Sequence, residues 1–403
     1  MLYRIEIENF FSVRERQVID LTVGRKVPDE PGRLVPIHDG SDLRAPSVVA
    51  IYGANASGKS NVLRAVAFAA WFIQSSFQQQ AGNALLYQKF ETKEMIGKIT
   101  RLSLTFAGLD GMMTGDLSKT CPYVYTLELS SRDTEGDRVI LESLYYRPSA
   151  TARMSRIFER NEDGEVKAAK WVATSKELSV LKSILRPDAS VISTLGQLNN
   201  ALALNFIRSA NAIDSNILLT RFEQSDSDLL KQYARNDLLL LDLNRDIRRI
   251  DLGVDQVHIV AENGGPVARF VHAGLDGALP LLIESHGTQQ FFKIYPLLHR
   301  ALALGGIALV DELDVAIHPA ILPEILRWFF DPDRNPHGAQ LWMSCHAVSL
   351  LDDLLKEEVV ICEKSPSGAT EVYRLADIQG IRRDDNILQK YLGGVYGGVP
   401  SIG

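Results

Sequence analysis

The stretch Gly53-Ala54-Asn55-Ala56-Ser57-Gly58-Lys59-Ser60 matches the spacing G-x-x-x-x-G-K-[ST] at every position. The apolar residues 48–52 before it predict a buried strand, and residues 61–68 after it are apolar at helical spacing. A strand, a glycine-bounded loop and a helix N-terminus place backbone N–H groups and the positive end of a helix dipole around one anion. The pattern therefore predicts a phosphate-binding loop, and the two correct flanks disfavour an ordinary glycine-rich turn.

Two side chains of this loop add chemistry of their own. Lys59 is expected to reach the β- and γ-phosphates of a nucleotide, and the Ser60 hydroxyl is expected to bind Mg²⁺. We therefore predict ATP and Mg²⁺ as cofactors. The residues predicted to contact the nucleotide or its metal are Gly53, Asn55, Ala56, Ser57, Gly58, Lys59, Ser60 and Asn61.

Residues 307–312 form a second chemical signal, a continuous apolar run that ends in two carboxylates. In enzymes with a phosphate-binding loop, the first such carboxylate holds the Mg²⁺ shell, and the second orients and deprotonates the attacking water. We assign Asp311 to the metal and Glu312 to the general base. The alternative, a strand that ends in a solvated acidic turn, is weakened by the loop upstream.

Small and hydroxyl residues at 284–290 precede a helix predicted from 288 to 304. Such a helix start can bind an anion that is held by another subunit. An ordinary N-cap by Ser285 or Thr288 is the favoured explanation when this segment is considered alone.

His346 follows the apolar residues 341–344, which predict another buried strand. A histidine at that strand end can sense or polarise the γ-phosphate, whereas a lone histidine is more often structural. Its place after the strand that follows the acid pair favours the functional assignment.

The composition bounds the class of protein. The chain has 403 residues, 46% of them hydrophobic, and a net charge of −7, which argues against a protein that coats nucleic acid without specificity. The arginines Arg147, Arg153, Arg156 and Arg160 are candidates for a local DNA contact, with a solvated hairpin face as the favoured alternative. Three cysteines without metal spacing, no signal-peptide pattern and no apolar run of membrane length predict a cytoplasmic protein without membrane contact.

The pattern of apolar residues divides the chain into three predicted parts. Residues 1–172 carry the phosphate-binding loop, and a period of two from residue 99 onward predicts an antiparallel meander. Leucines at helical spacing over 173–250 predict a compact helical insertion. Residues 251–403 alternate strands and helices around the acid pair. The expected fold class is α/β, a P-loop NTPase with an antiparallel β subdomain and a helical insertion.

The motifs occur in an informative order, with the phosphate-binding loop followed by a serine-glycine motif at 285–287, the acid pair and the histidine. This order resembles the ATPase heads of the ATP-binding-cassette (ABC) type found in SMC, RecF and OLD proteins. There the signature serine of one subunit caps the γ-phosphate bound by the other. The resemblance implies a signature role for Ser285 and Gly287, a D-loop role for Asp314 and a switch role for His346, in a homodimer or higher homo-oligomer.

Further stretches narrow the resemblance to the RloA-type bacterial AAA-family ATPases, which are similar to ATPase subunits of phage-defence and restriction-associated loci. These stretches are Ile7-Glu8-Asn9-Phe10, the loop at 53–60, Asp311-Glu312 with His318-Pro319, and the tail at 391–400. Two features depart from the pattern. His286 stands where transporters commonly have glycine, and no clear glutamine loop is present, because Gln88 and the run 78–80 are equal candidates.

The resemblance implies an ATP-hydrolysing, nucleotide-dependent dimerising switch in anti-phage defence. OLD-type nucleases carry a Toprim domain after the ATPase, and the stretch after His346 is too short for one. We therefore expect the effector, a nuclease being one candidate, to be a separate protein. The alternative is a RecF/SMC-like ATPase that binds DNA directly in DNA repair, and a third possibility is a nucleotide-bound scaffold without hydrolysis.

Overall fold

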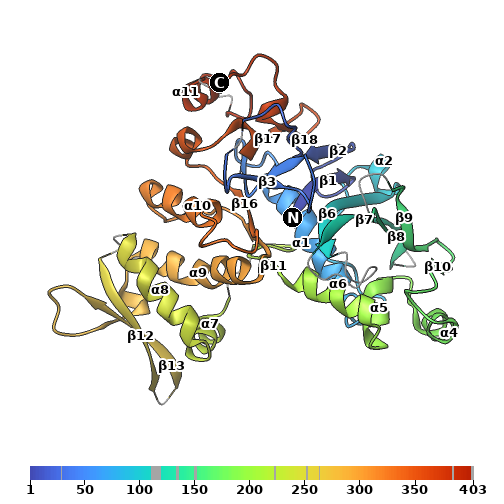
Figure 1. The fold of residues 1–403 in the computed structure, drawn as a ribbon, viewed down its shortest axis with the longest axis horizontal. Coiled ribbons are helices and arrows are strands. Elements are labelled where there is room, and N and C mark those ends of the chain that lie inside the picture. The colour runs from blue at the N-terminus through green and yellow to red at the C-terminus, as the bar shows by residue number, and fades with distance from the viewer. Residues whose placement is uncertain are drawn as a thin grey trace.

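The computed structural model describes all residues except 29, 110–118, 133–135, 149–151, 222–223, 251–252, 263, 384 and 401–403. Within the described residues the chain forms a six-stranded, mostly parallel sheet and a seven-stranded antiparallel sheet. A three-stranded sheet lies at the tip of an arm that projects from the body (Figure 1). The mixed α/β fold class is as the sequence predicts.

The six-stranded sheet is organised around β5, the strand that precedes the phosphate-binding loop. β5 pairs in parallel with β16 on one side and β17 on the other, and its residues are buried on both faces, which explains its continuous apolar sequence. Across the sheet the order is β11 (Ile213–Ser215), β15 (Ile307–Val310), β16 (Gln340–Ser344), β5 (Val48–Tyr52), β17 (Val359–Lys364) and β18 (Thr370–Arg374), and only the last strand runs antiparallel to its neighbour.

Helices cover both faces of this sheet. Val49 and Ile51 of β5 join the hydrophobic cluster that contains α1 (Lys59–Ser75). The alternate residues of β5 join the cluster that contains α9 (His286–Leu304) and α10 (Leu322–Phe330). Because parallel strands end at the same edge of a sheet, β5 and β15 bring the phosphate-binding loop and the acid pair to one edge.

The seven-stranded sheet confirms the predicted meander and extends it with the N-terminal hairpin. Its strands pair antiparallel in the order β10-β9-β8-β7-β6-β1-β2. Their bounds are β1 (Leu2–Glu8), β2 (Gln17–Asp20), β6 (Thr100–Leu109), β7 (Thr120–Arg132), β8 (Gly136–Tyr146), β9 (Ser155–Arg160) and β10 (Val166–Ala168).

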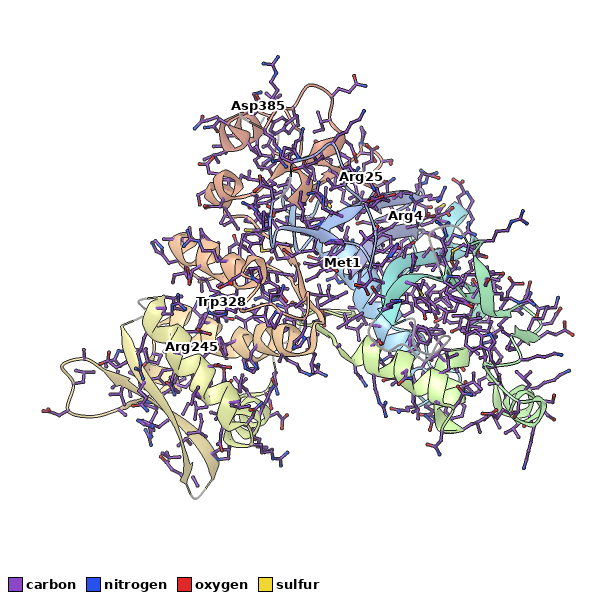
Figure 2. The ribbon with its side chains drawn as sticks, in the orientation of Figure 1. Met1, Arg4, Arg25, Arg245, Trp328 and Asp385 are labelled. Atoms are coloured by element: carbon purple, nitrogen blue, oxygen red, sulfur yellow. The ribbon has the colours of Figure 1, made fainter. Side chains whose placement is uncertain are left out.

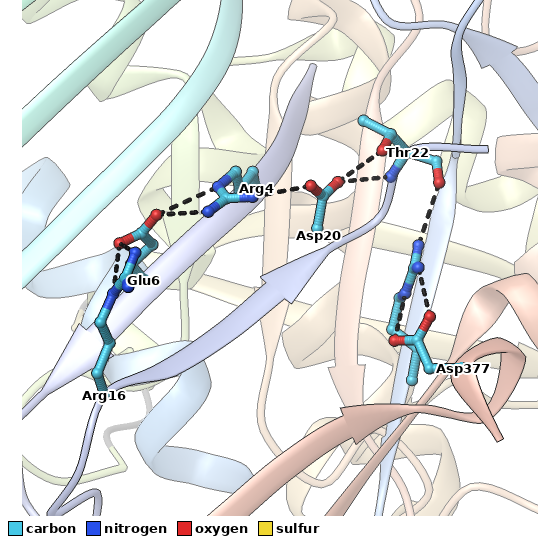
Figure 3. A network of polar contacts seen from close by, with 7 residues as sticks. Arg4, Glu6, Arg16, Asp20, Thr22 and Asp377 are labelled. Carbon is cyan, nitrogen blue, oxygen red and sulfur yellow. Dashed lines mark hydrogen bonds and ion pairs between the residues drawn. The ribbon is translucent and has the colours of Figure 1, made fainter. Parts of the chain in front are cut away.

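A polar network joins the edges of the two large sheets (Figure 3). Glu6 on β1 accepts hydrogen bonds from Arg4 and Arg16, and Arg4 also pairs with Asp20 at 2.9 Å. Arg374 of β18 then donates to the Thr22 carbonyl just after β2, at 3.2 Å. The antiparallel sheet is thereby fixed to the six-stranded sheet at the edge opposite β11. We call this six-stranded sheet the nucleotide sheet, because it carries the phosphate-binding loop.

The helices predicted over 173–250 are present, but they do not pack as one compact unit. Strand β11 interrupts the helices and enters the nucleotide sheet. The helices before β11 pack in the cluster of α1, whereas those after it pack in the cluster of α9. The first group is α4 (Ser175–Ile184), α5 (Val191–Gln197) and α6 (Ala201–Asn211), and the second is α7 (Asp226–Ala234) and α8 (Asp237–Arg249). A leucine period predicts a helix but not its packing partner, and the three-part division of the chain stays a prediction.

The arm consists of α7, α8 and the predicted hairpin β12 (Val254–Glu262) and β13 (Gly265–His272), extended by β14 (Leu279–Pro280). Buried Asp246 of α8 anchors the arm, because its carboxylate pairs with Arg334 and accepts from Tyr295 Oη at 2.6 Å. The Arg334 guanidinium also stacks on Trp328 at 4.0 Å, and Figure 2 shows Trp328 and Arg245 at this junction.

The other α-helices and strands of the described residues are short: β3 (Leu34–Pro36), β4 (Arg44–Pro46), α2 (Lys93–Ile96) and α11 (Ile387–Leu392). The described helices include none with the length and apolar character needed to cross a membrane.

Candidate functional site

The phosphate-binding loop has two glycines that no other residue can replace without strain. Gly58 is the N-cap of α1 at φ 107°, and a Cβ there would lie 2.2 Å from Thr370 Oγ1. Gly53 has φ 151°, and a Cβ there would lie 2.3 Å from the Cys362 carbonyl oxygen. The loop is therefore pressed against β17 and β18, and its glycines are required by close approach as well as by backbone conformation.

A chain of hydroxyl groups fixes the back of the loop. Asn61 Nδ2 donates to Ser12 Oγ at 2.5 Å, Ser12 Oγ lies 2.7 Å from Thr370 Oγ1, and Thr370 Oγ1 donates to the Ser57 carbonyl at 2.8 Å. The other end of the Asn61 amide accepts from Arg64 at 2.6 Å. Both ends of the Asn61 side chain are thus held by protein groups, which gives it a supporting place behind the loop. The sequence did not indicate Ser12 or Thr370, since each reaches the loop from a distant segment.

The remaining predicted loop residues differ in exposure. Asn55 and Ala56 are exposed at the tip, with Ala56 in the left-handed region at φ 62°. Ser57 is buried, and its hydroxyl has no hydrogen-bond partner among the described residues. Their predicted contacts with a nucleotide stay predictions.

Lys59 lies inside the loop. It is 6% exposed, and its Nζ donates to the carbonyls of Gly53 at 2.9 Å and Ala54 at 3.1 Å. Burial lowers the pKa of Lys59, and the nearby groups Cys362 and Asp311 partly offset that effect. An ammonium group has three protons, so these two carbonyls leave one proton for a phosphate oxygen.

Ser60 and Asp311 meet although they are far apart in the sequence. Ser60 Oγ donates to the two carboxylate oxygens of Asp311 at 2.8 and 3.0 Å, and Ser344 Oγ donates to Asp311 Oδ1 at 2.7 Å. The Asn216 side chain holds the backbone of Asp311. Its Oδ1 accepts from the Asp311 N–H at 2.8 Å, and its Nδ2 donates to the Asp311 carbonyl at 3.1 Å. One carboxylate and one hydroxyl, both hard oxygen donors, fit Mg²⁺, which takes few protein ligands and completes its shell with water and phosphate.

Glu312 has an unusual backbone and an unexpected partner. Its φ of 54° lies in the left-handed region, and its N–H donates to Ser344 Oγ at 2.7 Å. The carboxylate pairs with Arg221, whose Nη1 lies 2.5 Å from Glu312 Oε2. Neither Asn216 nor Arg221 was indicated by the sequence, because the three-residue strand β11 that positions them is too short to give a periodic signal.

Ser285 and Gly287 lie at the start of α9. Ser285 is the N-cap, and its Oγ accepts from the Thr288 N–H at 3.1 Å, so the ordinary N-cap that we considered above is present. Gly287 packs closely on the segment after the acid pair, because a Cβ there would lie 2.8 Å from the Ala316 carbonyl. In the described part of the chain, neither residue has a hydrogen bond to the phosphate-binding loop. Their predicted signature role stays a prediction.

Asp314 and His346 contact each other. The backbone N–H of His346 donates to Asp314 Oδ2 at 2.9 Å, whereas the His346 residue is exposed. Asp314 Oδ1 is buried without a hydrogen-bond partner among the residues that the structure describes. Burial, with a smaller contribution from Asp314, raises the pKa of the neighbouring Cys345 thiol to about 12. The contact links the two segments that were assigned as D-loop and switch.

The structure distinguishes the two candidates for a glutamine loop, Gln88 and the run 78–80. Helix α1 has 17 residues and is therefore about 25 Å long, which separates the glutamines at 78–80 from Ser60. The carbonyl of Gln88 accepts from the Phe11 N–H at 2.8 Å, and Phe11 stacks on Arg64 near the start of α1. Gln88 is the better candidate for a glutamine loop.

One of the four arginines predicted as a surface patch, Arg160, is buried. Arg160 is 2% exposed and donates to the Ala189 carbonyl at 2.6 Å, so it supports the fold from inside. Arg147, Arg153 and Arg156 are exposed.

The protein family described as "AAA domain, putative AbiEii toxin, Type IV TA system" matches residues 48–352. The chain belongs to this family. The match includes the phosphate-binding loop, the acid pair and His346, and membership in an AAA family agrees with nucleotide binding. No curated protein matches the chain.

The fold was also compared with solved structures. One is the SMC head bound to the C-winged helix domain of ScpA (12% identity, TM-score 0.47, 92% of this chain and 96% of that one). A second is the SMC head domain from Thermotoga maritima (13% identity, TM-score 0.40, 93% and 98%). A third is the Smc head domain with an extended coiled coil bound to the C-terminal domain of ScpA, from Pyrococcus furiosus (13% identity, TM-score 0.48, 98% and 100%). Likeness at this level says nothing about activity.

Proposed function

We propose that the chain is an ATP-hydrolysing ATPase of the ABC-head type that acts as a nucleotide-dependent dimerising switch. The observation that supports this most is the contact between Ser60 and Asp311, 251 residues apart in the sequence, at 2.8 Å. A hydroxyl from the loop after β5 and a carboxylate from the end of β15, with β16 between the two strands, form the protein side of a Mg²⁺–nucleotide site.

In this proposal each group has a defined task. Lys59 binds the β- and γ-phosphates, Ser60 and Asp311 hold the metal, Glu312 takes a proton from the attacking water, and His346 polarises the γ-phosphate. Mg²⁺, when bound, neutralises the charge that develops on the phosphate oxygens. A second copy of the chain contributes Ser285, Gly287 and Asp314, so that two heads enclose two ATP molecules.

We further propose that the switch is of the RloA type and controls a separate effector, a nuclease being one candidate, in defence against phage. The position of the tail at 391–400, next to the phosphate-binding loop, supports a role for the tail near the nucleotide. Its Gly398 lies against the loop, because a Cβ at Gly398 would be 3.6 Å from Gly53 Cα. Gly398 N–H also donates to Glu363 at 2.6 Å.

Phosphate release by the purified protein tests the ATPase. We expect Mg²⁺-dependent turnover that is lost in Lys59→Ala together with ATP binding. Glu312→Gln is expected to lower turnover at least about a hundredfold while ATP stays bound, because the variant keeps the site but lacks the base. If Lys59→Ala released phosphate at the wild-type rate, the protein would be a scaffold or the activity a contaminant. If Glu312→Gln did so, the assignment of the general base would be wrong.

A RecF/SMC-like ATPase that binds DNA directly is the second candidate. The exposed arginines Arg147, Arg153 and Arg156 favour it. Binding of duplex DNA whose affinity falls steeply with salt, and falls further when these arginines become glutamine, would support this candidate. DNA affinity that is unchanged in the triple variant would remove the observation on which it rests.

A further inference from the structure

Arg221 lies in the segment that follows β11, and β11 pairs with β15, the strand that ends at the acid pair. It ends a turn that begins at Asn216, whose amide holds both backbone groups of Asp311. Ile217 and Arg221 form an isolated antiparallel bridge, and Ser215 Oγ closes the turn by donating to the Ile217 carbonyl at 2.7 Å. The position of the Arg221 backbone is therefore coupled to that of Asp311.

The Arg221 guanidinium contacts the carboxylate of Glu312. The ion pair is 2.5 Å long, with side-chain exposures of 29% for Arg221 and 39% for Glu312. Both residues line a cavity of about 260 Å³ between β11, α9 and the segment after the acid pair. Lys293 and Gln290 of α9 line it too, whereas its lining includes no residue of the loop 53–60. Glu312 thus faces this side cavity.

This orientation matters for the chemistry. A general base must come within hydrogen-bond distance of the attacking water. A carboxylate that accepts a charge-assisted hydrogen bond from a guanidinium is held in one direction and loses one acceptor position. We propose that Arg221 is a positioning residue that holds Glu312 on the cavity side, so that turnover requires exchange of this ion pair for the attacking water. The inference rests on the proposed ATPase function.

The segment after the acid pair offers a route for releasing the base. Leu313, Val315 and Ile317 line the same cavity as the ion pair. Two non-glycine residues of this segment, Glu312 at 54° and Ala316 at 63°, have left-handed φ angles. Such residues persist only where surrounding contacts hold them, and they often mark segments with two arrangements. A surface that displaced this segment would also move Glu312 relative to Arg221.

The test is steady-state ATP hydrolysis by the full chain. In Arg221→Gln we expect kcat to rise by up to about fivefold, the upper end of the range for a solvent-accessible ion pair, while KM for ATP changes by less than about twofold. Arg221→Met, which keeps the aliphatic stem, is a second neutral variant in case the first does not fold. Arg221→Lys keeps the charge and is expected to stay near the wild-type kcat.

Arg300→Gln is the matched control, because Arg300 lines the same cavity but pairs with Asp214. We expect its kcat to equal that of the wild type. In the double variant Arg221→Gln/Glu312→Gln, the gain should vanish, since a released side chain without a carboxylate has no base to offer.

A kcat that falls or stays unchanged in both neutral Arg221 variants, with a normal melting temperature, would overturn the inference. So would an equal rise in Arg300→Gln. Failure of the proposed function is distinguishable, because it would show as phosphate release that survives Lys59→Ala, whatever the Arg221 variants do.

Discussion

The phosphate side of the candidate site and the proposed signature side differ in how completely this chain builds them. On the phosphate side, Lys59 and Asp311 are buried. Lys59 Nζ donates to two carbonyls of its own loop, and Asp311 is held by Ser60, Ser344 and Asn216. On the signature side, Ser285 contacts mainly its own helix, and the residues before it, Leu282 and Ile283, are 84% and 63% exposed. A preformed binding side and an apolar, exposed presenting side are what two copies of one chain need to complete each other.

The largest expected effect is on the phosphate side. Gly58→Ala puts a Cβ 2.2 Å from Thr370 Oγ1 at a φ of 107°, so the loop must move away from β18. We expect ATP affinity to fall roughly a hundredfold, about 2.7 kcal/mol, in a fluorescent-nucleotide titration. Gly24→Ala is the control, because a Cβ there meets nothing within 4 Å. Equal affinities for the two variants would mean that the loop does not bind the nucleotide in this conformation.

Mixing two inactive variants tests whether the two sides belong to one composite site. Lys59→Ala breaks the phosphate side. Ser285→Asp keeps an N-cap for α9 but opposes a phosphate with a negative charge. A one-to-one mixture is expected to recover about a quarter of the wild-type turnover, because half of randomly paired dimers contain one intact site of two. No recovery, although the subunits exchange, would contradict the composite site.

Leu282 and Ile283 test the presenting side without touching a polar group. Changing both to lysine should weaken ATP-dependent dimerisation by at least about tenfold, because two apolar side chains are lost from the interface. Light scattering in the Glu312→Gln background would measure it, since that variant retains ATP. The control changes Leu238 and Leu241 to lysine. These leucines are 70% and 62% exposed and lie on α8 rather than beside Ser285. A larger loss in the control would move the interface to the arm.

The same contrast explains what the sequence could predict. The loop at 53–60, the acid pair and the strands β5, β15 and β16 give strong local signals, because a buried parallel strand is a continuous apolar run and a phosphate cradle has fixed spacing. Arg221, Asn216 and Thr370 reach the site through tertiary contacts, and β11 is only three residues long. Their roles depend on which segments pack together, and the spacing of apolar residues within one segment does not reveal its packing partner. The split of the helices between two cores was missed for the same reason.

The smallest expected effect concerns how the signature segment is held. His272 of β13 has Nδ1 2.7 Å from the Gly253 carbonyl and Nε2 2.7 Å from Glu284 Oε1, next to Ser285. Both partners are acceptors, so both nitrogens must donate, which requires the imidazolium form. The hydrogen bond to Glu284 is the main cause that raises the pKa of His272 above 6.5, with Asp255 adding to it.

A raised pKa in the folded state means that the stabilisation is complete below the unfolded-state pKa and is lost as the pH rises through the folded-state value. We therefore expect hydrogen exchange of residues 279–288 to increase as the pH rises above about 6.5, after correction for intrinsic rates, by about 1 kcal/mol of local stability. His272→Gln should remove this pH dependence, whereas His258→Gln, at an exposed position on β12, should keep it. Loss of the His272–Glu284 contact would thus loosen the segment around Ser285 as the pH rises. The phosphate side would stay unchanged, because among the described contacts no histidine holds Lys59, Ser60 or Asp311.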